Sequence, residues 1–289
     1  MAVLSIQSHV VYGYAGNTAA VFPLQRLGRE VWAVNTVEFS NHTGYGSWKG
    51  QVLGAQLVSD LVTGLEERGV LNRCDAVLSG YLGDASICEA IIETVKKVRN
   101  AKSDVLYCCD PVMGDVGRGF FVKPDIPDMI KSKLIPLADI ICPNQFEMET
   151  ISGVEIKTIE DAVKALKTVH EMGPSVILVT SFREEPGKLS MLVSDKTNVY
   201  KTTTAELALC GNAAGTGDMT TAVFLSHYLE TKNAEKALEL CTASVYGVLE
   251  SSYKGSINNS NNPIELNIID EQHQFIFPSH SFKAEKILL

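Results

Sequence analysis

The sequence GNAAGTGD at residues 211–218 runs directly into the apolar, helix-compatible segment MTTAVFL at residues 219–225. Gly215 and Gly217 allow the backbone to turn tightly and to approach a ligand closely. The first N–H groups of the helix that follows have no acceptor within the helix, and the helix dipole adds partial positive charge at the same place. The stretch therefore predicts an anion site suited to phosphate.

Asp218, the last residue of the glycine-rich stretch, has two interpretations. A carboxylate beside a phosphate site repels the phosphate, unless it accepts a proton from a hydroxyl group that attacks the phosphorus. The alternative is that Asp218 only caps the helix, because aspartate is favoured at helix N-termini. Four residues recur by chance, so capping has the greater weight for this stretch alone. The stretches described below reverse that weight.

The composition is that of a folded protein with an acidic surface. The chain has 289 residues, of which 45% are hydrophobic, enough for the core of one large domain or two smaller ones. It contains no internal repeat and no linker long enough to divide it, so we predict a single domain over residues 1–289. The net charge of −9 argues against nucleic acid or an anionic membrane as the main partner.

Targeting signals and cysteine usage favour a cytoplasmic protein. No apolar run approaches the roughly 18 residues of a membrane-spanning helix, and no basic segment precedes the first strand-like residues. We therefore expect neither a membrane span nor a signal peptide. The seven cysteines include no CxxC pair, which favours reduced, mostly buried thiols. Cys108 and Cys109 are adjacent and would point to opposite faces of a strand.

Strand-like and helix-like segments alternate along the chain. The first strand (3–7) leads through a glycine-punctuated loop to a helix (18–27) and a second strand (30–35), which is the opening of an α/β unit with a parallel sheet. We predict further strands at 36–40, 76–79, 105–109, 138–141 and 175–181, helices at 55–68, 87–99, 126–133, 159–172, 218–230 and 234–252, and a hairpin of strands 188–194 and 198–203. Residues 116–121 are expected to form a mobile loop and residues 258–262 a surface loop. Leu57, Leu61 and Leu65 recur at helical spacing and predict the buried face of helix 55–68.

Polar and aromatic side chains stand at the carboxyl ends of predicted strands, where α/β sheets bind ligands. Ser8 follows the first strand, and its hydroxyl is a predicted ligand contact, with a turn or a helix cap as the alternative. Tyr81 follows strand 76–79, where its ring would stack on a flat ligand. Thr180 and Ser181 end strand 175–181 in the same way as Ser8.

Acidic residues follow two further strands. Asp110 and Asp115 lie just past strand 105–109, and magnesium prefers such oxygen ligands, usually few from protein and the rest from phosphate and water. The alternative is an ordinary turn, and the two interpretations have equal weight here. After strand 138–141, Asn144 would cap the next helix. Glu147 lies in the first turn of that helix, which suits either the helix dipole or a metal-bound water.

Residues 41–50, NHTGYGSWKG, are polar, glycine-rich and aromatic, and we predict that they form a flap of short strands over a flat substrate. Their glycine spacing departs from the dinucleotide-binding fingerprint and no strand–turn–helix context surrounds it, so we reject that motif. His42 is ambiguous, because a lone histidine is more often structural than catalytic and no carboxylate or serine partner is apparent in the sequence. The sequence contains no Walker A motif, which argues against a P-loop mechanism.

Together these stretches resemble the pyridoxal kinases of the ribokinase-like superfamily, and the resemblance covers nearly the whole chain. The motifs are SIQSHV (5–10) with GYAGN (13–17), FSNHTGY (39–45), CDPVMGD (109–115), PNQFE (143–147) and GTGD (215–218). The last three occur widely in the superfamily, whereas the first two single out the pyridoxal branch.

The resemblance implies a three-layer α/β/α domain with a mostly parallel central sheet and a small strand flap, assembled as a homodimer. The implied reaction is ATP-dependent phosphorylation of the 5′-hydroxymethyl group of pyridoxal, pyridoxine and pyridoxamine. ATP and Mg²⁺ are the implied cofactors, and the sequence leaves open whether K⁺ or Na⁺ also takes part. The partners would then be a vitamer, ATP and a second copy of the chain, without nucleic acid or membrane.

The resemblance also implies roles for individual residues. Asp218 would be the base, and the residues here called the anion loop, Gly215, Thr216 and Gly217, would form the anion hole. The vitamer would be bound by Ser8, Val37, Phe39, His42, Thr43 and Tyr81. Magnesium and the phosphates would be served, directly or through water, by Asp110, Asp115, Asn144 and Glu147, with the three acids as the metal ligands. Thr180 and Ser181 would contact the triphosphate.

Two segments depart from the relatives. Phe120 and Phe121 stand where some bacterial relatives carry a cysteine able to bond the aldehyde, so we expect no covalent adduct there. Residues 205–212 are unlike the relatives, and nucleotide affinity or lid behaviour would differ accordingly. The nearest rival function is a hydroxymethylpyrimidine kinase, which shares the fold and the anion loop. A rival from another class is a vitamer-binding protein without catalytic activity, against which Asp218 and the other acids argue.

Overall fold

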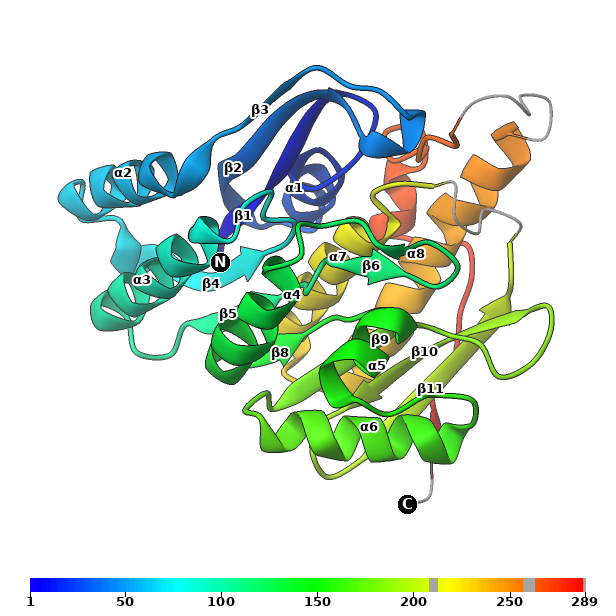
Figure 1. Ribbon diagram of the computed structural model, residues 1–289. Helices are drawn as coiled ribbons and strands as arrows, with labels where there is room; N and C mark the ends of the chain where they lie inside the picture. The colour runs from blue at the N-terminus through cyan, green and yellow to red at the C-terminus, as the bar shows by residue number, and fades with distance from the viewer. Residues whose placement is uncertain (208–212, 257–262, 288–289) are drawn as a thin grey trace.

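The computed structural model describes residues 1–207, 213–256 and 263–287, and a ten-stranded sheet runs through the middle of this part of the chain (Figure 1). Its strands, in spatial order, are β12 (Glu285–Ile287), β11 (Val199–Ala205), β10 (Lys188–Ser194), β9 (Val176–Phe182), β8 (Ile140–Ile141), β5 (Leu106–Cys109), β4 (Cys74–Ser79), β1 (Ala2–Tyr12), β2 (Glu30–Asn41) and β3 (Gly50–Val52). The strands from β9 to β2 are parallel to their neighbours, and antiparallel strands extend the sheet at both ends.

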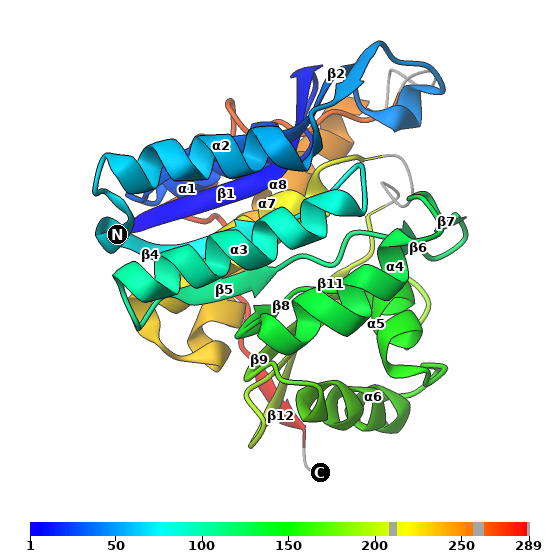
Figure 2. The same cartoon turned by 60° about the vertical axis from the view of Figure 1, so that its left-hand side comes forward.

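Helices cover both faces of the sheet, as the resemblance implies. One layer contains α1 (Asn17–Arg26), α7 (Thr216–Thr231) and α8 (Ala234–Ser256). The other contains α2 (Gly54–Glu67), α3 (Ser86–Ala101), α4 (Ile126–Met129), α5 (Gln145–Ser152) and α6 (Ile159–Glu171). Figure 2 shows the second layer in front of the sheet and the first behind it. The chain places strands on both sides of β1, and such a switch point is where α/β sheets bind ligands.

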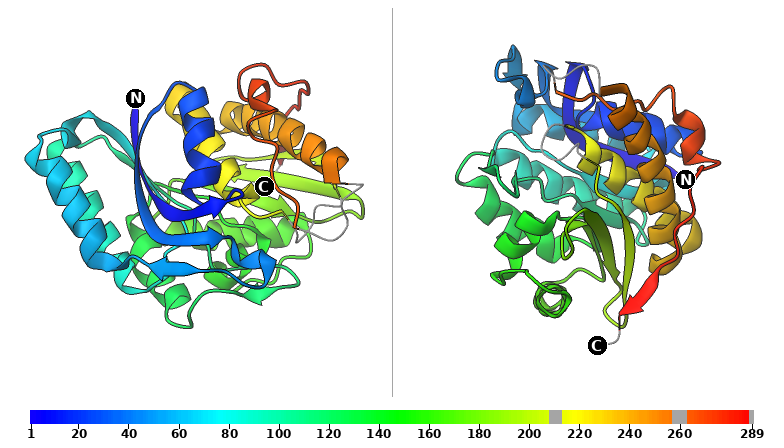
Figure 3. Two further views of the ribbon diagram at one scale, coloured as in Figure 1. Left: turned by 90° about the horizontal axis from the view of Figure 1, so that it is seen from above. Right: turned by 90° about the vertical axis from the view of Figure 1, so that its right-hand side faces the viewer.

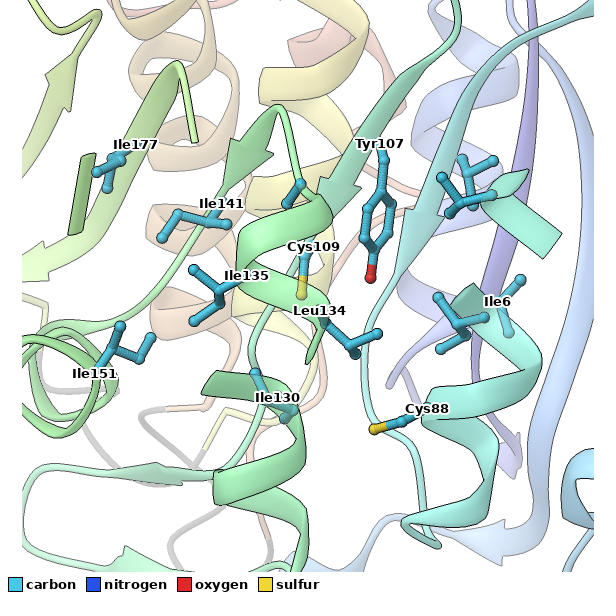
Figure 4. Packing of buried hydrophobic residues seen from close by; sticks show 14 of the residues in the cluster. Ile6, Cys88, Tyr107, Cys109, Ile130, Leu134, Ile135, Ile141, Ile151 and Ile177 are labelled. Atoms are coloured by element: carbon cyan, nitrogen blue, oxygen red, sulfur yellow. The ribbon is translucent and has the colours of Figure 1, made fainter. Parts of the chain in front are cut away.

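Each face of the sheet has its own hydrophobic core. Cys109 belongs to the cluster under α2, α3, α5 and α6, whereas Cys108 belongs to the cluster under α1, α7 and α8. The prediction that these two side chains point to opposite faces is therefore confirmed. In the first cluster the ring of Tyr107 and the thiol of Cys109 lie among the isoleucines of neighbouring elements (Figure 4).

The first two strands differ from their predicted boundaries. β1 continues past residue 7 to Tyr12, and residues 30–35 and 36–40 form one strand, β2, rather than two extended pieces. The pairing of β1 with β2 shifts register beyond Gln7, so that Thr36 and Val37 together lie opposite Ser8. This extra residue is a β-bulge, which bends the strand and re-aims its side chains near the ligand-binding edge. The flap contains the short helix Thr43–Tyr45 and leads into β3.

The predicted buried face of α2 is wrong by one position. Leu57 and Leu61 are 38% and 45% exposed, whereas Val58 and Val62 are fully buried. Leu65 packs partly against the core, so the buried stripe follows the spacing i, i+4, i+7. The leucine stripe and the stripe that contains Val58 and Val62 both satisfy helical periodicity. The leucine stripe was predicted to be buried only because it contains more leucines.

Residues 116–121 form part of a hairpin and not an irregular loop. β6 (Gly114–Asp115) pairs with β7 (Gly119–Phe120), and the Phe120 ring meets the Phe146 ring edge-on at 5.0 Å between centroids. The predicted helix 126–133 is split, because α4 continues as a π-helical turn (Ile130–Leu134) and a 3₁₀ turn (Ile135–Leu137). Two further 3₁₀ turns span Leu71–Arg73 and Gln272–Phe275.

The segment after α8 returns along the outside of that helix and ends in β12, which pairs with β11 (Figure 3). The expected surface loop at 258–262, Cys210 and most of the unusual segment 205–212 lie outside the described residues. Within the described residues, no helix combines the length and the apolar character needed to cross a membrane.

Candidate active site

A cleft of about 360 Å³ opens at the carboxyl ends of the parallel strands. Its walls come from β1, β2 and the flap, from the loop after β5, from the end of β9, and from the first turn of α7. All of the predicted site residues line it, namely Ser8, Val37, Phe39, His42, Thr43, Tyr81, Asp110, Asp115, Asn144, Glu147, Thr180, Ser181, Gly215, Thr216, Gly217 and Asp218. The fold thus gathers side chains from more than 200 residues of sequence, and their individual roles stay predictions.

The anion loop leads into α7, which begins at Thr216, two residues earlier than predicted. Gly215 is the residue before the helix, and its φ of 80° is a left-handed conformation that favours glycine. A side chain at Gly215 would also collide with the backbone carbonyl oxygen of Tyr14. Because Gly215 occupies the N-cap position, Asp218 lies in the first turn of α7 and is not the capping residue.

Asp218 is held by the loop between β1 and α1, here called the hub loop (residues 13–16). The backbone N–H of Gly16 donates to the carboxylate Oδ2 of Asp218 at 2.8 Å. Gly16 has φ 57° and ψ −127°, and any side chain there would overlap the carbonyl oxygen and the hydroxyl of Ser8. One glycine therefore connects Asp218 on α7 with Ser8 on β1.

Three carboxylates lie close together at the bottom of the cleft. Asp110 and Glu147 are 5% and 3% exposed, and the Thr221 hydroxyl donates to Asp110 Oδ2 at 3.1 Å. Burial, and then the neighbouring charges of Glu147 and Asp218, raise the pKa of Asp110 well above its ordinary value. Burial likewise raises the pKa of Glu147 and of Asp218. A divalent cation bound here would relieve this repulsion, so the donor chemistry fits magnesium.

The magnesium site would be incomplete without other ligands. Within the described residues, no group of three or more His, Cys, Asp or Glu side chains is placed to hold a metal ion. Both oxygens of Glu147 already accept backbone N–H groups, from Met113 at 3.0 Å and from Asn144 at 2.9 Å. Asp115 accepts the N–H of Val116 at 2.7 Å and is partly exposed. Phosphate oxygens and water would have to complete the coordination.

Asn144 caps α5, as the sequence predicts. Its side-chain oxygen accepts the N–H of Glu147 at 3.0 Å, and the Glu147 carboxylate reaches back to the N–H of Asn144, which completes a capping box. The Asn144 amide also donates to the carbonyl oxygen of Gly114 at 2.8 Å. This pair of bonds fixes Glu147 beside the start of the β6–β7 hairpin.

The opposite end of the cleft is apolar with a few polar groups. Val37 on β2 is fully buried, and the Thr36 hydroxyl fixes Tyr81 by donating to its carbonyl oxygen at 2.7 Å. Phe39 lies 6.0 Å from Trp48 between ring centroids. Thr43 begins the short helix of the flap and is exposed. This combination of two ring-sized apolar walls and sparse donors suits a small flat ligand.

His42 has a partner that the sequence analysis did not find. Its Nε2 lies 3.1 Å from the Oε1 of Glu265, a residue 223 positions away in the segment after α8. His42 is 6% exposed, and its Nδ1 is buried without a partner. No local pattern signals such a long-range pair, because Glu265 stands in the irregular sequence PIELN.

Two arginines that the sequence analysis did not assign also line the cleft. Arg183 follows β9 and donates from Nε to Glu206 at 2.8 Å. Arg118 lies between β6 and β7, with its guanidinium carbon 5.3 Å from the centre of the Phe121 ring. Both bring positive charge to a cleft that otherwise carries four acids, as an anionic ligand requires.

Known proteins resemble this chain over its entire length. Residues 65–265 match the family model described as phosphomethylpyrimidine kinase. A pyridoxal kinase PdxY from Rubrobacter xylanophilus is 47% identical over 289 residues, which cover 99% of this chain and 97% of that protein. A pyridoxal kinase PdxY from Granulibacter bethesdensis is 47% identical, with 99% of each chain covered. A solved structure of pyridoxal kinase from Leishmania donovani, in complex with ADP and pyridoxamine, has a TM-score of 0.89 and 30% identity over 99% of both chains.

Proposed function

Because the chain belongs to the pyridoxal kinase family, we propose that it transfers the terminal phosphoryl group of ATP to the 5′-hydroxymethyl group of a vitamin B6 vitamer, with Asp218 as the general base. The vitamers are pyridoxal, pyridoxine and pyridoxamine, and pyridoxal gives pyridoxal 5′-phosphate. The related Leishmania enzyme has been solved with ADP together with pyridoxamine or pyridoxine. Ligands of this size and shape suit the two ends of the cleft.

The position of Asp218 carries the proposal. Its carboxylate lies in the first turn of α7, directly after the anion loop, and lines the same cleft as Ser8 and Thr43. If Asp218 served only as a helix cap, it would occupy the N-cap position, but Gly215 occupies that position. The N–H of Gly16 donates to one carboxylate oxygen, Oδ2, and the carboxylate held in this way would accept the vitamer's proton.

The proposed reaction is an in-line displacement at the terminal phosphorus. The vitamer's hydroxyl oxygen forms the new bond to phosphorus, the bond to the β-phosphate oxygen breaks, and ADP leaves with the bonding electrons. Asp218 takes the hydroxyl proton. The N–H groups of the anion loop lie at the start of α7, where the helix dipole favours the negative charge of the moving phosphoryl group.

The acids next to Asp218 would serve the nucleotide's metal ion. Asp110 would offer an oxygen ligand, and Glu147 and Asp115 would act through water, since their oxygens already accept N–H groups. A bound Mg²⁺ would neutralise the charge of the phosphates. Thr180 and Ser181, which are partly exposed at the end of β9, would donate hydroxyl hydrogen bonds to the triphosphate, with Asn144 on the same side. Participation of K⁺ or Na⁺ stays a prediction from the resemblance, as does a homodimer.

The vitamer's ring would occupy the apolar end of the cleft. Val37, Phe39 and Tyr81 would pack on its faces, and Ser8 and Thr43 would bond its polar atoms. His42 would present its buried Nδ1 to a hydroxyl or ring N–H of the vitamer. The β-bulge opposite Ser8 supports this arrangement, because it turns Val37 and the strand end toward the cleft.

An assay of ATP consumption and phosphorylated product with each vitamer, with and without magnesium, tests the proposal. We expect pyridoxal 5′-phosphate to appear in proportion to ADP, and a preparation that binds pyridoxal without consuming ATP would instead be a vitamer-binding protein. A second candidate is a hydroxymethylpyrimidine kinase, which the description of the matching family model favours. The ratio of kcat/KM for pyridoxal to that for hydroxymethylpyrimidine decides between them, and a ratio below one would reject our proposal.

A further inference from the structure

Glu265 is the centre of a half-buried hydrogen-bond cluster beside the cleft. Its Oε1 accepts from the Tyr45 hydroxyl at 2.8 Å and lies 3.1 Å from His42 Nε2. Its Oε2 accepts from the backbone N–H of Tyr14 at 3.0 Å. The carboxylate thus ties the flap, which contains His42 and Tyr45, to the hub loop, which contains Tyr14.

The charge state of the cluster follows from these bonds. Burial alone would raise the pKa of Glu265, but the hydrogen bonds from His42, Tyr45 and the Tyr14 N–H outweigh it and hold this pKa below its usual range. An ionised Glu265 only accepts hydrogen bonds, so His42 must donate from Nε2. In neutral His42 the other ring nitrogen, Nδ1, is then an acceptor, and it is buried with no protein partner.

The hub loop passes directly against this carboxylate. Gly13 has a φ of 83°, and a side chain there would overlap both oxygens of Glu265. Three residues later, the N–H of Gly16 donates to Asp218. Glu265 and Asp218 therefore hold the two ends of the same four-residue loop.

The residue before Glu265, Ile264, contacts the segment that leads into the anion loop. Ile264 forms a parallel β-bridge with Ala213, two residues ahead of Gly215. The segment 263–265 thus contacts the flap, the hub loop and the approach to the anion loop. The flap carries His42, the hub loop donates a hydrogen bond to Asp218, and the third segment leads into the anion loop.

We propose that Glu265 is a positioning residue for phosphoryl transfer, which fixes the tautomer of His42 at the vitamer end of the cleft and, through the hub loop, the orientation of Asp218. This inference rests on the proposed function, because it assumes that the vitamer and Asp218 meet in this cleft. Glu265 itself contacts neither reactant. It acts by removing alternative positions of the two loops before the vitamer arrives, which is preorganisation of the site.

The test replaces Glu265 with glutamine, which has nearly the same shape but only one acceptor oxygen. Three donors converge on Glu265, and in Glu265→Gln the new NH₂ group must face at least one of them. We expect kcat/KM for pyridoxal to fall about tenfold or more, because hydrogen bonds to a charged group are lost, while KM for ATP changes less than about twofold. Glu265→Asp keeps the charge and is expected to recover part of the loss.

The matched control is Glu239→Gln. Glu239 also anchors the segment after α8, by accepting the N–H of Ala284 at 3.2 Å and by pairing with Lys236, but it does not line the cleft. Its kinetic constants are expected to match those of the unmodified enzyme. Thermal unfolding of all variants separates loss of fold from loss of positioning, since a structural role predicts a lower Tm with unchanged kcat/KM per folded molecule.

The outcomes distinguish this inference from the function on which it rests. If the unmodified chain forms no pyridoxal 5′-phosphate, the proposed function is wrong. If the chain is active and Glu265→Gln keeps its kcat/KM within about twofold, or if Glu239→Gln loses as much, Glu265 has no positioning role. If Glu265→Gln fails to fold, Tyr45→Phe removes one donor from the same carboxylate and should still lower kcat/KM for pyridoxal but not affinity for ATP.

Discussion

Replacing Gly16 with alanine should damage both stability and catalysis, and a second glycine, just past the other end of the same helix, allows the two causes to be separated. Gly16 and Gly28 flank α1 and have positive φ values of 57° and 80°. A side chain at Gly28 would meet nothing within 4 Å, whereas one at Gly16 would overlap Ser8. Gly28→Ala therefore reports the backbone penalty alone, about 1–2 kcal/mol of unfolding free energy.

Gly16→Ala adds two further losses. The hub loop must move away from Ser8, and strain of this kind costs roughly 1–3 kcal/mol beyond the backbone penalty. The movement also lengthens the hydrogen bond from Gly16 N–H to Asp218, and a bond to a charged acceptor contributes about 1.5–3 kcal/mol. That loss would appear as a drop of about tenfold to a hundredfold in kcat/KM.

Urea unfolding measures the first quantity, and steady-state kinetics with pyridoxal and ATP measure the second. We expect Gly28→Ala to keep normal kinetic constants and to lose less unfolding free energy than Gly16→Ala. Equal losses in the two variants would contradict the predicted overlap with Ser8. A Gly16→Ala enzyme with kcat/KM within about threefold of normal would refute the hub loop as the element that holds Asp218.

Three further predictions concern the acids and one buried histidine. Asp218→Asn should lower kcat roughly a hundred- to ten-thousandfold with little change in Tm. Single-turnover assays and thermal unfolding measure these two quantities. Near-normal turnover would show that Asp218 is not the base. Asp110→Asn should raise Tm in the absence of magnesium, and the increase should be larger at pH 8 than at pH 6. Burial and the charges of Glu147 and Asp218 raise the pKa of Asp110, so its ionisation as the pH rises costs stability. A lower Tm at both pH values would contradict this prediction. Burial and the neighbouring Arg29 lower the pKa of His227 from 6.5 to about 4, so the unfolded chain binds more protons between these pH values and stability should be lost as pH falls through them. Between pH 7 and pH 5 this loss is about 2 kcal/mol of unfolding free energy, and His227→Gln should be less sensitive to pH by that amount in urea titrations.

The sequence was sufficient to predict the layers of the fold and the membership of the cleft. Ser8, Tyr81 and Asp110 each follow a predicted apolar strand, and parallel strands bring their carboxyl ends to one edge of the sheet. The cap of α5 by Asn144 was also predicted, because asparagine is favoured at that position, whereas the reciprocal bond from Glu147 was not. In each case a local sequence pattern determines a local structure, and the sheet then determines which residues far apart in the sequence come together.

The errors occurred where two local patterns were equally regular or where the partner was remote. α2 carries two stripes at helical spacing, and packing against the sheet selects Val58 and Val62 over Leu57 and Leu61. The continuation of β1 to Tyr12 depends on pairing with β2, so the glycine at residue 13 and not the polar residues before it ends the strand. Glu265 could not be assigned to His42, since nothing in an irregular segment encodes a contact across 223 residues.

The place of Glu265 in the chain has a consequence for synthesis on the ribosome. β1, the flap and α7 emerge from the exit tunnel before residues 263–287, because they precede them in the chain. A nascent polypeptide can therefore contain every strand from β1 to β11 and Asp218 while the flap and hub loop still have no carboxylate to join them. Competence for phosphoryl transfer would then be acquired only after Glu265 has emerged and docked against the flap and the hub loop.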